Sequence, residues 1–235
     1  ISLAEPKKQN YLHGAAILAA GVVIMKILGF IYKVPLGNIL GDEGYTHFLV
    51  AYNIYSVFLT VATAGLPVAL SRMISEANTM NRPNQVKRIF SVAWLTFCVL
   101  GVVCTLIMFL FPTELADALN DVEASQSILA LSPAVLLVCL TSAYRGYCQG
   151  HENMRPTTVG QVLEVLVKVV IGLVLAWYLK DLGKSLPLVS AGAIFGVTAG
   201  SLAALVYMFA YKRRNYAALP GGGDEPESRG QILST

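Results

Sequence analysis

Charged residues are scarce in this sequence. Of its 235 residues, 13% are Asp, Glu, Lys or Arg and 55% are hydrophobic, whereas soluble domains carry about 25% charged residues. A soluble core of this length could not bury so much apolar surface, so lipid must cover part of it. The net charge of only +3 gives no reason to expect a nucleic-acid partner. The composition therefore predicts an integral membrane protein.

Motifs for catalysis are also missing. The sequence contains no GxSxG, HExxH, Walker loop or paired-carboxylate pattern. The three histidines, His13, His47 and His151, fall near the ends of apolar runs, and none has an evident partner at ligand spacing. We therefore expect a protein that is not an enzyme, with no catalytic residues, no metal site and no cofactor.

The cysteines show no pattern of a disulfide framework or a zinc site. No CxxC or Cys/His spacing occurs among them. The four are Cys98, Cys104, Cys139 and Cys148, and the first three lie inside apolar segments. We interpret them as small apolar residues of membrane helices.

Six apolar stretches are long enough to cross a membrane as helices. A bilayer core of about 30 Å requires about 20 apolar residues in a helix. The stretches cover 12–35, 46–74, 88–111, 127–147, 157–179 and 187–211. Polar or turn-rich segments separate them, such as GNILGDEGYT after the first. They are too long for transmembrane strands and do not alternate as strands do. The predicted fold class is an all-α membrane protein of about six helices.

The basic residues predict the orientation of these helices. Lys and Arg gather before the first stretch and after the second, fourth and sixth, whereas the first and third connections are acidic. By the positive-inside rule, both ends of the chain lie in the cytoplasm. We divide the chain into a cytoplasmic segment at 1–11, a membrane domain at 12–214 and a Gly/Pro-rich cytoplasmic linker at 215–235.

Lysines inside the first stretch are candidates for a functional site. Lys26 lies about 20 Å along this helix, near the bilayer centre, and Lys33 follows seven positions later on roughly the same face. Ionisable residues at this depth are costly and usually face a cavity or a partner. Lys26 therefore either lines a watery cavity or forms a structural ion pair, and Lys33 could instead extend to the outer interface.

The fifth stretch carries a polar stripe. Gln161, Glu164 and Lys168 stand at i, i+3 and i+7 and share one helix face. Glu164 and Lys168 also have the favourable i, i+4 order for an ion pair, so the stripe is either self-neutralised or lines the same cavity as Lys26.

Two further patterns concern helix shape. In AGLPVALSR, Gly65 and Pro67 are expected to interrupt the second stretch, and Pro133 is expected to act similarly in the fourth. The small residues of AGAIFGVTAGSLAA in the last stretch favour close packing of helices.

Two segments resemble a known family. They are KILGFIYKVPLGNILGDEGYTHFLVAYNIYSVFLTVATAGLPVALSRMISEAN and YRGYCQGHENMRPTTVGQVLEVLVKVVIGLVLAWYL. They look like the stage V sporulation protein B branch of polysaccharide and lipid II flippases, within the multidrug/oligosaccharidyl-lipid/polysaccharide exporter superfamily. The resemblance covers roughly 12–214, and the strings GDEG and RGYxQGxxxMxPT carry most of it.

The resemblance implies one lobe of a two-lobed, alternating-access transporter in a bacterial plasma membrane. Its substrate would be a lipid-linked oligosaccharide or peptidoglycan precursor, moved from the inner to the outer leaflet, and its partners the bilayer, a missing C-terminal lobe and a coupling ion. The family's cationic cavity implies substrate binding by Lys26 first. Weaker candidates are Lys33, Arg72, Arg145 and Lys168, beside the polar residues Gln161 and Glu164.

Two other functions stay open. A related multidrug and toxin extrusion antiporter would favour cationic drugs and need an acidic site, whereas two deep lysines against one glutamate favour an anionic substrate. A non-transporting membrane scaffold is the other possibility. Further membrane spans downstream of Thr235 would exclude the scaffold.

Overall fold

A computed structural model of the chain describes residues 11–216, Pro226 and Ile232. Within this part, all regular secondary structure is helical, as predicted. The segment 1–10 and nearly all of the expected linker lie outside the described residues, so their assignment stays a prediction. The elements are α1 (Tyr11–Thr63), α2 (Leu66–Thr79), α3 (Pro83–Leu110), α4 (Pro112–Asp117), the 3-10 helix η1 (Val122–Ala124), α5 (Ser125–Gly150), α6 (Arg155–Asp181) and α7 (Leu186–Tyr216).

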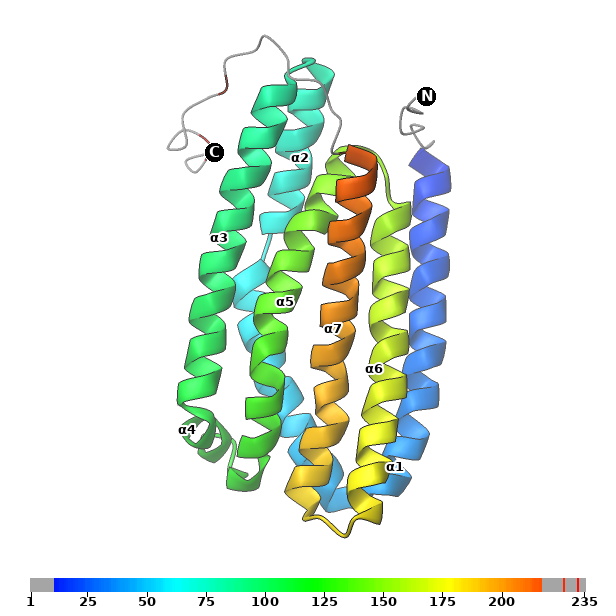
Figure 1. The fold of residues 1–235 in the computed structure, drawn as a ribbon, viewed down its shortest axis with the longest axis vertical. Helices are drawn as coiled ribbons and strands as arrows, with labels where there is room; N and C mark the ends of the chain where they lie inside the picture. Colours follow the sequence, from blue (N-terminus) through cyan, green and yellow to red (C-terminus); the bar gives the residue numbers. More distant parts are fainter. Residues whose placement is uncertain (1–10, 217–225, 227–231, 233–235) are drawn as a thin grey trace.

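The first helix contains two membrane crossings. With 53 residues, α1 is about 80 Å long at 1.5 Å per residue, far more than one crossing needs. Gly41 breaks it with φ 66° and ψ −173°, a left-handed φ that favours glycine. In Figure 1 the chain descends along the first part of α1 and ascends again behind α5 and α7. The loop expected at GNILGDEGYT is therefore mostly helical, with its reversal at one residue.

The number of crossings follows from this break. By length and composition, five helical stretches of the described chain could cross a membrane, and the first covers 62 residues of α1 and α2 from Leu18 to Thr79. Gly41 divides that stretch in two, which gives the six predicted crossings.

The second crossing is interrupted where the sequence predicts. α1 ends at Thr63, Gly65 has φ 72°, and α2 begins with Leu66 and Pro67 in its first turn. Proline suits that position, because the N–H it lacks would have no partner within the helix. Pro133 behaves differently, since it lies exposed inside α5 without ending the helix.

Helix α7 lies at the centre of the bundle, between α5 and α6 (Figure 1). Its small residues bring it very close to α6, as AGAIFGVTAGSLAA predicts. A Cβ atom at Gly196 would lie 2.6 Å from the backbone oxygen of Lys168 and 2.7 Å from Cα of Gly172. The α6–α7 contact is therefore backbone against backbone, and it sets the height of Lys168 relative to α7.

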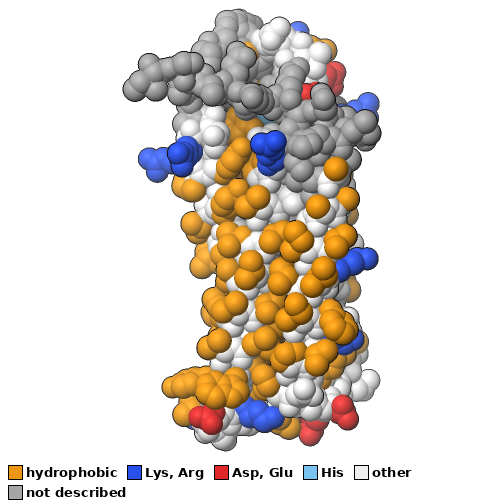
Figure 2. Space-filling model, turned by 90° about the vertical axis from the view of Figure 1, so that its right-hand side faces the viewer, with side chains coloured by type: hydrophobic (Ala, Val, Ile, Leu, Met, Phe, Trp, Pro, Cys, Tyr) orange, Lys and Arg blue, Asp and Glu red, His pale blue; other side chains and the backbone are white. Residues whose placement is uncertain are grey.

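The surface fits a membrane environment. Figure 2 shows hydrophobic side chains over the middle of the molecule, with most charged ones toward its two ends. Large apolar side chains such as Phe30, Val68 and Trp177 are more than 60% exposed. Such a continuous apolar surface would be unusual in a soluble monomer, so lipid or another protein segment covers it.

We predict that Gly196→Ala destabilises the bundle by about 1–3 kcal/mol, because the added methyl group meets backbone atoms that cannot move aside cheaply. Gly29→Ala is the matched control, since a Cβ there would find no atom within 4 Å. Thermal unfolding of both variants in detergent checks this. Equal unfolding temperatures would show that the α6–α7 contact tolerates a larger side chain.

Candidate functional site

A partly buried ion pair and a serine hydroxyl group link three helices of the bundle. Nη2 of Arg145, on α5, donates a hydrogen bond of 2.6 Å to Oε2 of Glu164, on α6. Oγ of Ser201, on α7, donates to the other carboxylate oxygen at 3.2 Å. The side chains of Arg145 and Glu164 are only 15% and 20% exposed. Because both carboxylate oxygens have donors, Glu164 connects α5 and α7 to α6.

Lys168 lies one turn further along α6, and its surroundings are aromatic. Its Nζ atom lies 5.5 Å from the ring centre of Tyr32 and 5.1 Å from that of Tyr52. Both tyrosines belong to α1, on opposite sides of Gly41. Tyr32 also donates a hydrogen bond to the carbonyl oxygen of Ala193 at 3.2 Å. Lys168 therefore joins both crossings of α1 to α6 through cation–π contacts.

These contacts correct one sequence expectation. The spacing of Glu164 and Lys168 favours an ion pair between them, but in the described part of the chain Glu164 pairs with Arg145 instead. The guanidinium group of Arg145, from a neighbouring helix, fits the carboxylate well. The rings of Tyr32 and Tyr52 instead stabilise the ammonium group of Lys168. We call Arg145, Glu164, Lys168 and Ser201 the inner polar cluster.

Lys26 and Lys33 do not join this cluster. Both are exposed on α1, and their seven-residue spacing keeps them on one face. Tyr32 is buried and contacts Lys168, and it stands six residues after Lys26, which corresponds to a rotation of about 120° around the helix. The lysine face of α1 therefore points away from the side that packs on Lys168. Within the described residues, no ion pair or hydrogen bond of Lys26 occurs.

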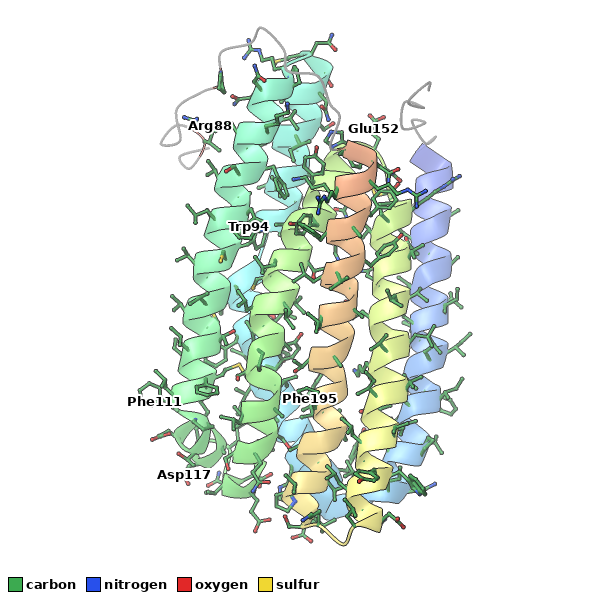
Figure 3. The ribbon with its side chains drawn as sticks, viewed as in Figure 1. Arg88, Trp94, Phe111, Asp117, Glu152 and Phe195 are labelled. Atoms are coloured by element: carbon green, nitrogen blue, oxygen red, sulfur yellow. The ribbon has the colours of Figure 1, made fainter. Side chains whose placement is uncertain are left out.

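The remaining candidates occupy other places. Gln161 is half-buried on α6, one turn before Glu164, and Arg72 is exposed on α2. Figure 3 shows that side chains project both into the bundle and outward along its whole length. The predicted site residues thus form an internal group and an exposed group, and their role in binding a substrate stays a prediction.

Sequence reasoning missed a cationic pocket at the end of the bundle where α7 ends. The pocket has a volume of about 270 Å³ and is lined by Lys87, Phe90, Tyr144, Tyr147, Phe209, Lys212, Arg213 and Tyr216. Nζ of Lys212 lies 3.2 Å from the ring centre of Phe90 and 4.8 Å from that of Tyr147. Lys212 belongs to the basic residues after the sixth apolar stretch, which in the sequence predict only the orientation of the helices. Three cations among aromatic rings suit a phosphate group at the membrane interface.

A group of three side chains that could bind a metal ion was also not predicted, and it lies at the opposite end of the bundle from the cationic pocket. Ligand atoms of Glu43, His47 and Glu123 lie within 4.8 Å of one another, although the sequence predicted no metal site. The four-residue spacing of Glu43 and His47 could have signalled part of it, because i and i+4 side chains share a helix face.

Comparison with known proteins identifies the family. Residues 11–229 match the family described as polysaccharide biosynthesis protein. The chain belongs to this family. It is 32% identical over 203 residues to stage V sporulation protein B of Bacillus subtilis (strain 168), which covers 86% of this chain and 39% of that protein. It is 28% identical over 218 residues to lipid II flippase MurJ of the same organism, covering 88% of this chain and 40% of that protein.

Solved structures agree with the family assignment at the level of fold. A MOP superfamily transporter from Pyrococcus furiosus Vc1 matches with a TM-score of 0.67 at 16% identity, over 98% of this chain and 52% of that one. An outward-facing multidrug resistance MATE family transporter matches with a TM-score of 0.69 at 15% identity and the same coverage. The chain thus spans about two fifths of the curated relatives and half of the solved transporters. The predicted resemblance and the predicted all-α lobe are confirmed.

We predict that Arg145→Met lowers the free energy of unfolding by about 3 kcal/mol, because it leaves the Glu164 carboxylate unpaired in a largely buried position. Adding Glu164→Gln should restore part of this loss, since the uncompensated charge is then removed. A double-mutant cycle measured by denaturation in detergent quantifies the coupling. Strictly additive effects would mean that the pair contributes no interaction energy.

Proposed function

We propose that this segment of a polysaccharide biosynthesis family protein is one half of a flippase. It moves a lipid-linked oligosaccharide or peptidoglycan precursor from the inner to the outer leaflet by alternating access. The observation that carries the proposal is exposed Lys26 in the middle of an apolar crossing, without a described partner. The lipid II flippase among the relatives supports the substrate class.

A lysine that faces lipid is energetically costly, so the exposed face of α1 that carries Lys26 and Lys33 has to be covered by something polar. A lysine at the centre of a membrane helix costs about 2.5–3.5 kcal/mol on insertion scales when it faces lipid. Lys26 and Lys33 share one exposed face of α1. A second lobe opposite that face, with a watery cavity between the two, removes this cost. The double length of the solved transporters supports such an arrangement.

The charge of the cavity favours a phosphate-bearing substrate. Two lysines on one face attract an anion such as the pyrophosphate of a lipid-linked sugar. A drug-exporting antiporter would need a free carboxylate for its cations. The only acidic residue within the six apolar stretches is Glu164, and Arg145 already neutralises it. This pairing favours the flippase over the antiporter.

The cell membrane of a bacterium is the proposed location, with both chain ends in the cytoplasm. The distribution of Lys and Arg supports this orientation. It places α4 and η1 outside the cell and the cationic pocket around Lys212 at the cytoplasmic interface, where an anionic headgroup would enter.

We expect Lys26→Ala, in a full-length transporter that carries this segment, to reduce flipping of a lipid-linked precursor in proteoliposomes to the background rate. The substitution removes the charge that compensates the phosphate groups in the apolar middle of the membrane. Lys26→Arg should retain part of the activity because it keeps the charge.

Lys184→Ala is the matched control, since it removes an exposed lysine from the connection between α6 and α7. It should flip the precursor at the unaltered rate. Unchanged transport by correctly inserted Lys26→Ala would remove Lys26 from the substrate path. No transport by the unaltered protein would favour the scaffold.

Orientation can be tested by labelling in intact cells, in a chain whose four cysteines are replaced by alanine. We expect a membrane-impermeant maleimide to label Asp117→Cys, in exposed α4, and to spare Arg82→Cys, between α2 and α3. Lysed cells should label at both positions. The reverse pattern in intact cells would invert the proposed orientation.

A further inference from the structure

A buried histidine at the end of the bundle that carries α4 is held in one orientation. Nδ1 of His47 donates to both carboxylate oxygens of Asp121, each at 2.7 Å. The His47 side chain is only 7% exposed and that of Asp121 12%. A carboxylate on Nδ1 fixes the proton of a neutral imidazole on that nitrogen. The Nε2 atom is then left with a lone pair.

This Nε2 atom points at a second carboxylate. Among the described residues it is buried and has no hydrogen-bond partner, although Oε2 of Glu123 lies 3.4 Å away. With the proton on Nδ1, both atoms are acceptors and repel each other unless something positive lies between them. A metal ion between the two atoms fills that role and uses both lone pairs at once. The Glu123 side chain is 63% exposed, so an ion from solution can reach the position.

A third ligand stands one turn before His47. Glu43 and His47 are four residues apart on α1 and share a helix face. The ligand atoms of Glu43, His47 and Glu123 all lie within 4.8 Å of one another. In a tetrahedral site with bonds of about 2.05 Å, neighbouring ligand atoms are about 3.3 Å apart. The observed separation of 3.4 Å between Nε2 and Glu123 already matches such an edge.

We propose that Glu43, His47 and Glu123 bind a divalent transition metal ion of the Zn²⁺ class, with water as the fourth ligand. One imidazole and two carboxylates form a donor set that suits Zn²⁺. Asp121 acts as the positioning residue that orients the imidazole, a role that carboxylates commonly have beside metal-bound histidines.

The site joins parts of the chain that are far apart in sequence. Glu43 and His47 lie at the start of the second crossing, directly after the break at Gly41, and Glu123 lies in η1, between α4 and α5. In Figure 1, α4 lies at the end opposite the C-terminus of α7, which places the metal away from the cationic pocket. A bound ion would clamp the second crossing to the α4–α5 connection.

The experiment uses the purified chain with a histidine-free affinity tag and Zn²⁺ alone, added after treatment with a chelator. We expect Zn²⁺ to raise the thermal unfolding temperature by several degrees and to bind with a stoichiometry of one by titration calorimetry. Excess Mg²⁺ should not compete, because it prefers octahedral oxygen ligands. Co²⁺ should give the visible absorption of a four-coordinate site.

Variants of the proposed ligands test whether Zn²⁺ binds at this site. Glu43→Gln and Glu123→Gln change exposed side chains, so both should fold and each should weaken Zn²⁺ binding at least about tenfold. Asp121→Asn should weaken it by about 10–100-fold, as expected for an orienting partner. Asp117→Asn is the matched control, because it removes another exposed carboxylate at this end of the bundle (Figure 3), and it should bind as the unaltered chain does.

Two results would overturn the proposal. One is Zn²⁺ binding that Glu43→Gln and Glu123→Gln leave unchanged, which would place the ion elsewhere, for example at His151. The other is no Zn²⁺ binding by the unaltered chain at neutral pH, which would leave the three side chains without a metal.

Discussion

The arrangement of this bundle depends on the close backbone contact between α6 and α7. Gly196 lies against the backbone of Lys168 and Gly172, with no room for a Cβ atom. In lipid there is little hydrophobic force between helices, so such close packing has to provide the association. The same contact brings Ser201 to Glu164, and Arg145 completes the pair from α5. The inner polar cluster is therefore a product of small residues on α7.

The charges of the membrane-embedded part fall into two groups with different surroundings. Inside the bundle, Arg145 pairs with Glu164, and Lys168 lies over the rings of Tyr32 and Tyr52. Lys26 and Lys33 are exposed on the outer face of α1. Internal pairing stabilises the bundle, whereas an unpaired lysine at membrane depth requires something opposite it. This difference makes Lys26 the strongest candidate for substrate contact.

The two ends of the bundle also differ in chemistry. Where α7 ends, lysines and an arginine lie among aromatic rings, which suits an anion. At the end that carries α4, carboxylates surround a buried histidine, which suits a cation. Both groups come together only in the folded chain. Asp121 is 74 residues from His47 in sequence, and the residues that line the cationic pocket come from α3, α5 and α7.

The sequence by itself determined the membrane environment, the six crossings, the break at Gly65 and Pro67, and the small-residue face of α7. These features depend on local composition and on the length that a helix needs to cross lipid. Only the tertiary structure decided that Gly41 reverses the chain without a loop, that Glu164 pairs with Arg145 rather than with Lys168, and that His47 meets Asp121 and Glu123. Spacing along one helix shows which residues share a face, but contacts between helices depend on how those faces pack.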